Sequence, residues 1–265
     1  MQEHLIKSVE TISEKYGKDR LIFIGLYGSQ NYNLDYEDSD FDFKAIIVPS
    51  LNDIILNKKP VSTTVEIEDG LCDVKDLRTM MNCWKKQNVN FVELLFSKAM
   101  WIHPEYKDSF QPLLDNKEKI VHYDEKHAIN CIKGMTVEKY HALFKPYPSQ
   151  IYEIEKHGYA AKQLSHILRL KDLLEKYVSK KSYSECLTSD PLTRDILIKI
   201  KNYTYIICPE QVEHLALAAM DSINKIAEDF EPAPIEERTG QIMDAVTSDI
   251  IRKALKKELS EDLEG

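Results

Sequence analysis

The sequence predicts an α+β protein, with a small mixed β-sheet in its first part and an all-helical second part. Short apolar or alternating runs at about 21–27, 40–48, 63–68 and 71–75 are typical of strands, and all of them precede residue 110. Beyond that point the apolar residues recur at helical spacing instead. The change of period therefore predicts a sheet-containing part followed by a helical part.

Local signals place the individual elements. An amphipathic helix is expected at about 2–16, and Ser29 can cap a short helix after the first strand. Pro49 stops the second strand, Asp69-Gly70 is a hairpin turn, and Asp76 is expected to cap the helix that follows, to about residue 86. The other expected helices are at about 52–57, 90–98, 110–119, 124–144, 150–178, 184–187, 192–201, 209–229 and 236–262.

The composition indicates a soluble protein of the cytoplasm. The chain has 265 residues, of which 43 % are hydrophobic and 30 % charged. Its five cysteines are scattered, and no Cys-x-x-Cys pair occurs, which favours reduced thiols over disulfides or a zinc site. No apolar run reaches the length of a membrane span and no signal peptide opens the sequence, so we expect no membrane partner.

The charge is uneven along the chain. The net charge of −9 argues against a protein that coats nucleic acid. Between residues 133 and 181, however, ten lysines and arginines face five acidic residues, a balance of +5. A basic segment of this kind suits an anionic substrate, although an ordinary solvated helix surface would have the same composition.

Two aspartates at alternate positions stand out in the second strand. Side chains alternate across a strand, so Asp40 and Asp42 are expected on one face and Phe41, Phe43 and Ala45 on the other. Two neighbouring carboxylates repel each other unless a divalent cation lies between them. This pattern predicts a metal site.

The turn before that strand predicts a place for an anion. Gly28 permits close backbone approach, and Ser29 adds an N–H and a hydroxyl. A calcium loop of the EF-hand type does not fit, because the positions of its glycine and glutamate hold Phe43 and Pro49. A solvated strand face remains the plain alternative for the aspartates. Asp38 is interpreted as a loop residue, although a supporting role next to the metal is open.

Gly28-Ser29, a gap of ten residues and Asp40-Phe41-Asp42 together resemble the signature of the nucleotidyltransferase superfamily related to DNA polymerase beta. Segments 90–96 and 159–170 are similar to the subgroup of predicted nucleotidyltransferases linked to RNA ligases and RNA repair. The resemblance covers roughly residues 20–175. One departure is that Asn33 stands where the subgroup usually has a second glycine, and Asn is the residue that best tolerates a positive φ after glycine.

The resemblance implies a catalytic core at 1–110 and a helical domain at 111–265 that closes the cleft. It also implies Mg²⁺, or Mn²⁺ in its place, held by Asp40, Asp42 and a third carboxylate from a later strand. We favour Asp73, on the strand after the hairpin, with Glu66 and Glu68 as rivals. Gly28 and Ser29 would contact the β- and γ-phosphates of an NTP.

A basic stripe on a later helix is the second candidate for the nucleotide. Lys162, His166 and Arg169 fall at i, i+4 and i+7, so they share one helix face. We interpret them as a wall that contacts the phosphates or the base, supported by a similar helix in the subgroup. The alternative is a surface ion-pair network with Asp172 and Glu175.

The resemblance implies that the protein moves an NMP from an NTP to a hydroxyl and releases pyrophosphate. We favour an RNA end, such as that of a tRNA, as the acceptor. Alternatives are a protein acceptor, as in NMPylating enzymes of toxin–antitoxin and conflict systems, and a small molecule. A different class of function is a catalytically silent nucleotide-binding regulator. The sequence leaves the oligomeric state open.

Overall fold

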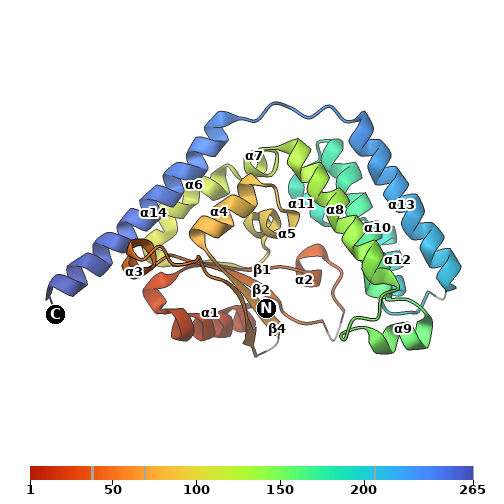
Figure 1. Cartoon of the computed structure of the whole chain (residues 1–265), viewed down its shortest axis with the longest axis horizontal. Coiled ribbons are helices and arrows are strands. Elements are labelled where there is room, and N and C mark those ends of the chain that lie inside the picture. The colour runs from red at the N-terminus through yellow and green to blue at the C-terminus, as the bar shows by residue number, and fades with distance from the viewer. Residues whose placement is uncertain (37–38, 69, 206, 265) are drawn as a thin grey trace. The chain divides into compact units, whose positions relative to one another are not determined.

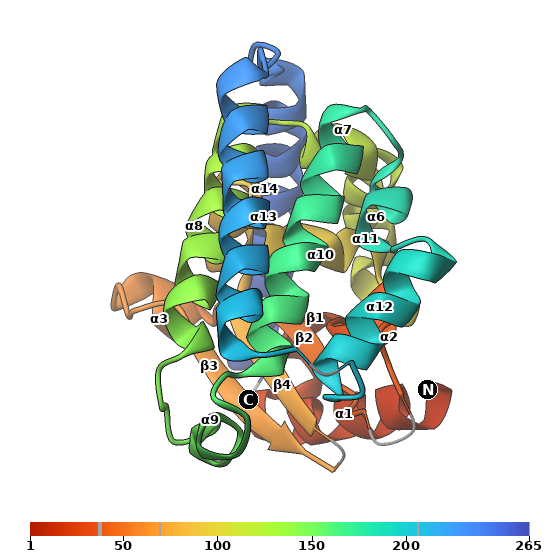
Figure 2. The same ribbon diagram turned by 90° about the vertical axis from the view of Figure 1, so that its right-hand side faces the viewer.

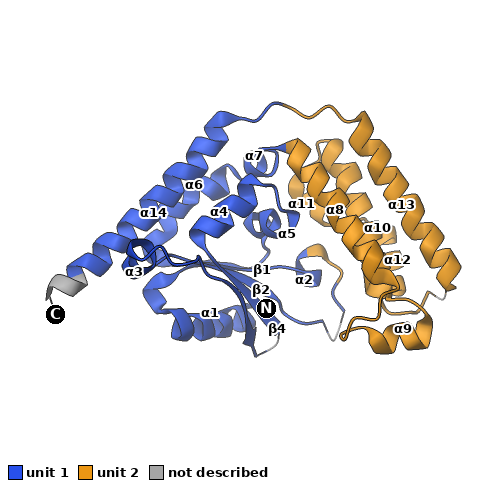
Figure 3. Ribbon diagram, viewed as in Figure 1, with its two compact units in different colours: residues 1–31, 35–124, 234–265 blue, residues 32–34, 125–233 orange. Residues whose placement is uncertain are grey.

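The computed structural model covers the whole chain and describes residues 1–36, 39–68, 70–205 and 207–264, the last four without side chains. Its residues divide into two compact units (Figure 3). The sheet unit comprises residues 1–31, 35–124 and 234–265, and the helical unit comprises 32–34 and 125–233. The sheet unit thus extends to residue 124 and includes the last helix, whereas the expected boundary was after residue 110.

A five-stranded mixed sheet forms the centre of the sheet unit (Figure 1). Its strands are β1 (Leu21–Leu26), β2 (Phe43–Ile47), β3 (Ser62–Ile67), β4 (Gly70–Asp76) and β5 (Met100–Ile102). They lie in the order β3-β4-β2-β1-β5, with β2 and β4 parallel and the other neighbours antiparallel. The α+β class and the small mixed sheet are confirmed. The edge strand β5 was not predicted, since three residues carry little periodic signal.

Helices cover both faces of this sheet. On one face α1 (Gln2–Tyr16) buries Leu5 and Ile12 against residues such as Phe43, Ala45 and Val74. On the other face Phe23 stacks on Phe110 of α6, with ring centroids 5.1 Å apart, and α4 also packs there. The remaining helices and 3₁₀ turns of the unit are η1 (Lys18–Arg20), α2 (Ser29–Tyr32), α3 (Leu51–Ile55), α4 (Leu77–Lys85), α5 (Val89–Val92), η2 (Glu93–Phe96), η3 (Pro104–Tyr106), α6 (Lys107–Asp115), α7 (Lys117–Val121) and α14 (Glu237–Glu264).

The helical unit is built around α10 (Ala161–Val178). Helices α8 (Glu125–Leu143), α12 (Pro191–Lys201) and α13 (Pro209–Asp229) pack against α10, and Figure 2 shows α8, α10 and α13 side by side. The shorter helices are α9 (Ile151–His157) and α11 (Tyr183–Leu187). The expected single helix over 150–178 is wrong. Gly158, with a φ of 80°, ends α9, and α10 starts three residues later.

Several residues that were expected to begin or end a helix or turn do so in the structure. Asp76 caps α4, because its Oδ1 accepts a hydrogen bond from the Arg78 N–H at 2.9 Å. Asn33 has a φ of 61°, as its place in the turn requires. Strand β2 begins at Phe43 rather than at residue 40, so Asp40 and Asp42 precede it. Among the described residues no helix is long and apolar enough to cross a membrane.

Candidate functional site

The structure places two of the predicted metal ligands, Asp42 and Asp73, on the same face of the sheet. Asp42 extends the ladder by one residue, because its carbonyl accepts a hydrogen bond from the Tyr27 N–H at 3.0 Å. In the parallel pairing of β2 and β4, Lys44 lies opposite Asp73. Since residues two apart on a strand share a face, Asp42, Lys44 and Asp73 are neighbours. Asp40 is exposed and lies two residues further from the strand.

The carboxylate of Asp42 is held between two glycines. Its Oδ1 accepts a hydrogen bond from the Leu71 N–H at 3.1 Å. A Cβ at Gly70 would lie 2.7 Å from the Phe41 carbonyl oxygen, so only glycine fits there. A Cβ at Gly28, which has a φ of 79°, would lie 3.8 Å from Asp42 Oδ2. The Gly28 turn therefore lies directly beside the Asp42 carboxylate.

A buried lysine lies behind the two carboxylates. The side chain of Lys44 is only 3 % exposed, and its Nζ lies 3.5 Å from the centroid of the Tyr27 ring. It donates to the Asn90 carbonyl and lies 3.9 Å from Glu93 Oε1, whose side chain is 0 % exposed. Burial lowers the pKa of Lys44, while Glu93, Asp73 and Asp42 oppose that shift. Lys44 thus supplies an internal positive charge to the acidic face.

Tyr27 and Lys75 complete this face. Burial, and then the charges of Asp42, Asp73 and Glu93, raise the pKa of the Tyr27 hydroxyl, so it stays protonated at neutral pH. Lys75 Nζ lies 3.6 Å from Asp73 Oδ1 and donates to Ser62 Oγ at 2.8 Å. Tyr27 is therefore a neutral hydroxyl under the influence of these carboxylates, and Lys75 is a cation close to Asp73.

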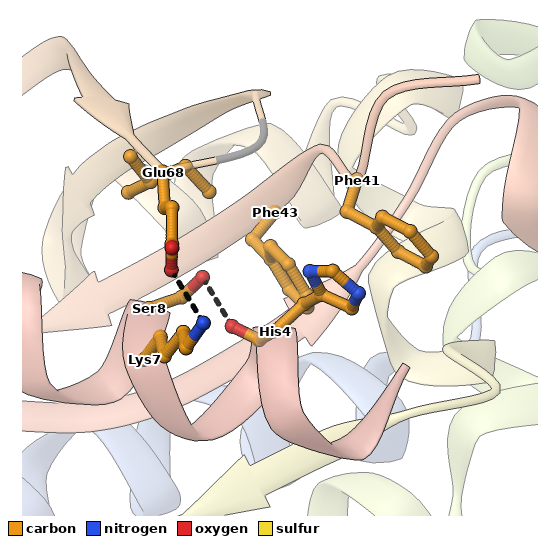
Figure 4. A pocket seen from close by; sticks show the side chains of 7 residues that line it. His4, Lys7, Ser8, Phe41, Phe43 and Glu68 are labelled. Carbon is orange, nitrogen blue, oxygen red and sulfur yellow. Dashed lines mark hydrogen bonds and ion pairs between the residues drawn. The ribbon is translucent and has the colours of Figure 1, made fainter. Parts of the chain in front are cut away.

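The rivals for the third carboxylate lie elsewhere or at the edge of the sheet. Glu68 pairs with Lys7 of α1 at 2.8 Å, beside Phe43 on the face that α1 covers (Figure 4). Glu66 is opposite Leu71 in the pairing of β3 with β4 and is exposed. Of the three candidates, Asp73 is the one whose charge acts on Tyr27 and Lys44 together with that of Asp42. Asp38 lies outside the described residues.

Asp42 and Asp73 are two carboxylates on one sheet face, the type of ligand that divalent cations take. No group of three or more His, Cys, Asp or Glu side chains that could hold a metal ion occurs among the described residues. Magnesium is commonly held by one or two carboxylates together with the phosphates of the substrate, and it prefers oxygen ligands. The two carboxylates provide that kind of donor set, whereas a complete protein cage of Asp40, Asp42 and Asp73 is not formed.

A small cavity lies on the other face of the sheet. It is lined by His4, Lys7, Phe41, Phe43 and Glu68, among others, and His4 stacks on Phe41 with ring centroids 4.0 Å apart (Figure 4). Its volume of about 10 Å³ is close to the minimum for one water molecule. Phe41 and Phe43 therefore point toward α1, on the opposite face from Asp42, as the alternation predicted; Asp40 precedes the strand and is not part of it.

The predicted basic stripe lies on α10 in the helical unit. Lys162 is exposed near the start of the helix, whereas Arg169 is buried and stacks on Tyr32 with Cζ 3.9 Å from the ring centroid. The expected alternative, a surface network with Asp172 and Glu175, involves other lysines. Lys176 pairs with Asp172 at 2.8 Å and Lys171 with Glu175 at 2.6 Å. The three predicted residues therefore do not form that network.

Sequence reasoning missed several residues of these environments, among them Tyr27, Lys44, Gly70, Glu93 and Tyr32. One of them had a visible signal. Lys44 is a charged residue inside the apolar run 43–48, where a strand buried on both faces would be expected to be apolar throughout. Tyr27 directly precedes Gly28, whereas Gly70, Glu93 and Tyr32 each reach their environment through contacts between distant segments.

The sequence matches no protein-family model and no curated protein. The resemblance to the nucleotidyltransferase superfamily therefore rests on the motif residues of this chain alone.

Proposed function

We propose that this protein is a Mg²⁺-dependent nucleotidyltransferase that moves an NMP from an NTP to a hydroxyl acceptor. The observation that carries the proposal is the position of Asp42 and Asp73 on one sheet face with the Gly28 turn beside Asp42. An apolar strand, a Gly-Ser turn and an acidic second strand bring oxygen ligands and phosphate-binding backbone groups together. That combination suits the transfer of a phosphoryl group.

The chemistry follows from these groups. The acceptor oxygen forms a bond to the α-phosphorus, and the bond from that phosphorus to the oxygen bridging to the β-phosphate breaks. Pyrophosphate leaves with the electron pair, and the hydroxyl proton is released. Mg²⁺, when bound, would stabilise charge on the phosphate oxygens.

The residues of the sheet unit divide these tasks. Asp42 and Asp73 would hold the cation, and Asp40 would join them only when the substrate is bound. Gly28 and Ser29 would bind the β- and γ-phosphates. Lys44 would keep the two carboxylates in place, because its buried charge attracts both. We favour an RNA end as the acceptor, and a protein hydroxyl is the alternative that the test must separate.

The test is transfer of label from each of four α-labelled NTPs, with Mg²⁺, to total RNA or to total protein extract. We expect label in RNA, and we expect Asp42→Asn and Asp73→Asn each to reduce transfer on the order of 10³-fold. Glu10→Gln, which changes an exposed carboxylate of α1, is the matched control and should retain full transfer. Glu66→Gln should retain it too if Asp73 is the partner of Asp42.

The outcomes separate the candidate functions. Label that is sensitive to protease rather than to RNase would replace the RNA acceptor by a protein. Full activity of both aspartate variants would refute the assigned site. NTP binding without any transfer would favour a nucleotide-binding regulator over an enzyme.

A further inference from the structure

Arg169 is a buried arginine whose hydrogen-bonding capacity is not fully used. It lies in α10 and is 5 % exposed. Its Nε and Nη1 are shielded from solvent and have no hydrogen-bond partner among the described residues. Leaving a buried donor unsatisfied costs about 1–3 kcal/mol, and more when the group is charged. Such a side chain is a poor choice for stability alone, which indicates another role.

Tyr32 orients this guanidinium. The Tyr32 ring is 7 % exposed and lies over Arg169 with Cζ 3.9 Å from its centroid. Stacking of this kind covers one face of the guanidinium and stabilises its charge. The N–H bonds of a guanidinium lie in its plane, so stacking leaves them directed at groups around its edge. Arg169 is therefore held in a geometry suited to an anion.

Basic residues also lie around His166, one turn before Arg169 in the same helix. The pKa of His166 lies well below its usual value, first because its partly buried side chain is desolvated and then because of nearby cations. The four charged groups that act most strongly are Arg169 and Lys162 of α10, Lys139 of α8 and Lys201 of α12. His166 is therefore neutral at pH 7 and keeps one N–H to donate. Basic residues of three helices thus act on His166, and one of them, Lys139, is also paired with Glu138 at 2.9 Å.

We propose that Arg169, Tyr32 and His166 form an anion-binding site in the helical unit, and that its ligand is a phosphoryl group. A phosphoryl group carries more than one charge and several acceptor oxygens, which matches an arginine, a neutral histidine and the surrounding lysines. The choice of a phosphoryl group over another anion rests on the proposed function. The two sources of the group are the triphosphate of an NTP and the phosphates of an RNA strand.

Binding must open the site slightly. Because Nε and Nη1 are shielded from solvent, neighbouring side chains shift when the anion arrives. We therefore expect the NMR signals of the Arg169 Nε–H and of the Tyr32 ring to change during a titration. These signals report on the site directly, independently of any enzymatic activity.

The test is calorimetric and NMR titration of the full chain with inorganic triphosphate and, separately, with a short RNA oligonucleotide. Both titrations are done in EDTA, so that binding does not depend on a metal held by Asp42 and Asp73. Arg169→Met should weaken binding by at least about tenfold, equivalent to about 1.4 kcal/mol. Lys171→Met, which removes a more exposed charge two residues along the same helix, is the matched control and should bind normally.

Two further variants test whether a loss of binding by Arg169→Met reflects misfolding. Arg169→Lys keeps the charge but not the planar donors, and Tyr32→Leu removes the stacking ring, so both should weaken binding in chains that unfold cooperatively. If the Arg169 variants lose triphosphate binding, the phosphoryl group that this site binds is that of a nucleotide. If they lose only RNA binding, it is a phosphate of a polynucleotide. Equal binding by Arg169→Met and the unmodified protein, or no binding of either probe, would overturn the proposal. Normal triphosphate binding with no nucleotidyl transfer would leave this site intact and refute the proposed function alone.

Discussion

Lys44 in the sheet unit and Arg169 in the helical unit are both buried cations, but their surroundings differ in charge. Lys44 lies 3.9 Å from a Glu93 oxygen and is influenced by Asp73 and Asp42. Arg169 stacks on an aromatic ring, and two of its nitrogens have no partner among the described residues. The buried cation of the sheet unit therefore has carboxylates close to it, whereas the buried cation of the helical unit keeps two donors unpaired within the described part of the chain, which the proposed anion would satisfy.

The largest effect on stability should come from removing one member of the buried Lys44–Glu93 pair. Lys44→Met leaves the fully buried Glu93 without its cation, and we expect the free energy of unfolding to fall by about 3–5 kcal/mol. Glu93→Gln should also be costly, but the double variant should cost much less than the sum of the two. Urea unfolding of all four proteins measures this coupling. Simple additivity would show that the two charges do not compensate each other.

The second largest effect on stability should come from Gly70, which packs against the backbone of Phe41 next to Asp42. Gly70→Ala would place a methyl group 2.7 Å from the Phe41 carbonyl oxygen. We expect a loss of about 1–3 kcal/mol in the free energy of unfolding, together with reduced transfer, because Asp42 must move. Gly134→Ala in α8 is the control. A Cβ there meets no atom within 4 Å, so the variant should be stabilised by up to about 1 kcal/mol. Similar results for both glycines would contradict the assigned role of Gly70.

The third effect concerns Arg169, the buried cation whose donors are not all satisfied by the described residues. Arg169→Met removes two unsatisfied donors and keeps a long apolar side chain in the core. Its free energy of unfolding should change by less than about 1 kcal/mol or rise, in contrast to that of Lys44→Met. A loss of several kcal/mol in the same urea experiment would mean that the charge and donors of Arg169 are satisfied within the folded protein, as the charge of Lys44 is.

The smallest effect is a dependence on pH. Because the pKa of His166 is lowered in the folded chain, the unfolded chain takes up the histidine proton first as the pH falls below 7. The contribution of His166 to stability is therefore present above its unfolded pKa and is lost as the pH falls. The stability of the unmodified protein relative to His166→Gln should decrease between pH 7 and pH 5 in thermal unfolding. A constant or increasing difference would contradict the burial of a neutral imidazole among cations.

Strand and helix positions were predictable where near neighbours decide them. Helix α13 lies at Pro209–Asp229, as expected, because proline and a change in apolar spacing mark its limits. The expected helix over 90–98 is instead α5 followed by the 3₁₀ turn η2. This difference matters for the site, since that turn carries Glu93 against Lys44. A contact between residues 49 positions apart leaves no periodic pattern in the sequence.

The sequence by itself determined the alternation of Asp42 with Phe41 and Phe43, and the turn at Gly28 that precedes them. These features depend on the two-residue period of a strand and on the allowed φ of single residues. Only the tertiary structure decided that Asp73 joins Asp42, that Glu68 pairs with Lys7, and that Tyr32 covers Arg169. Those contacts join distant segments, and which segments pair is decided by the packing of the whole core rather than by local preference.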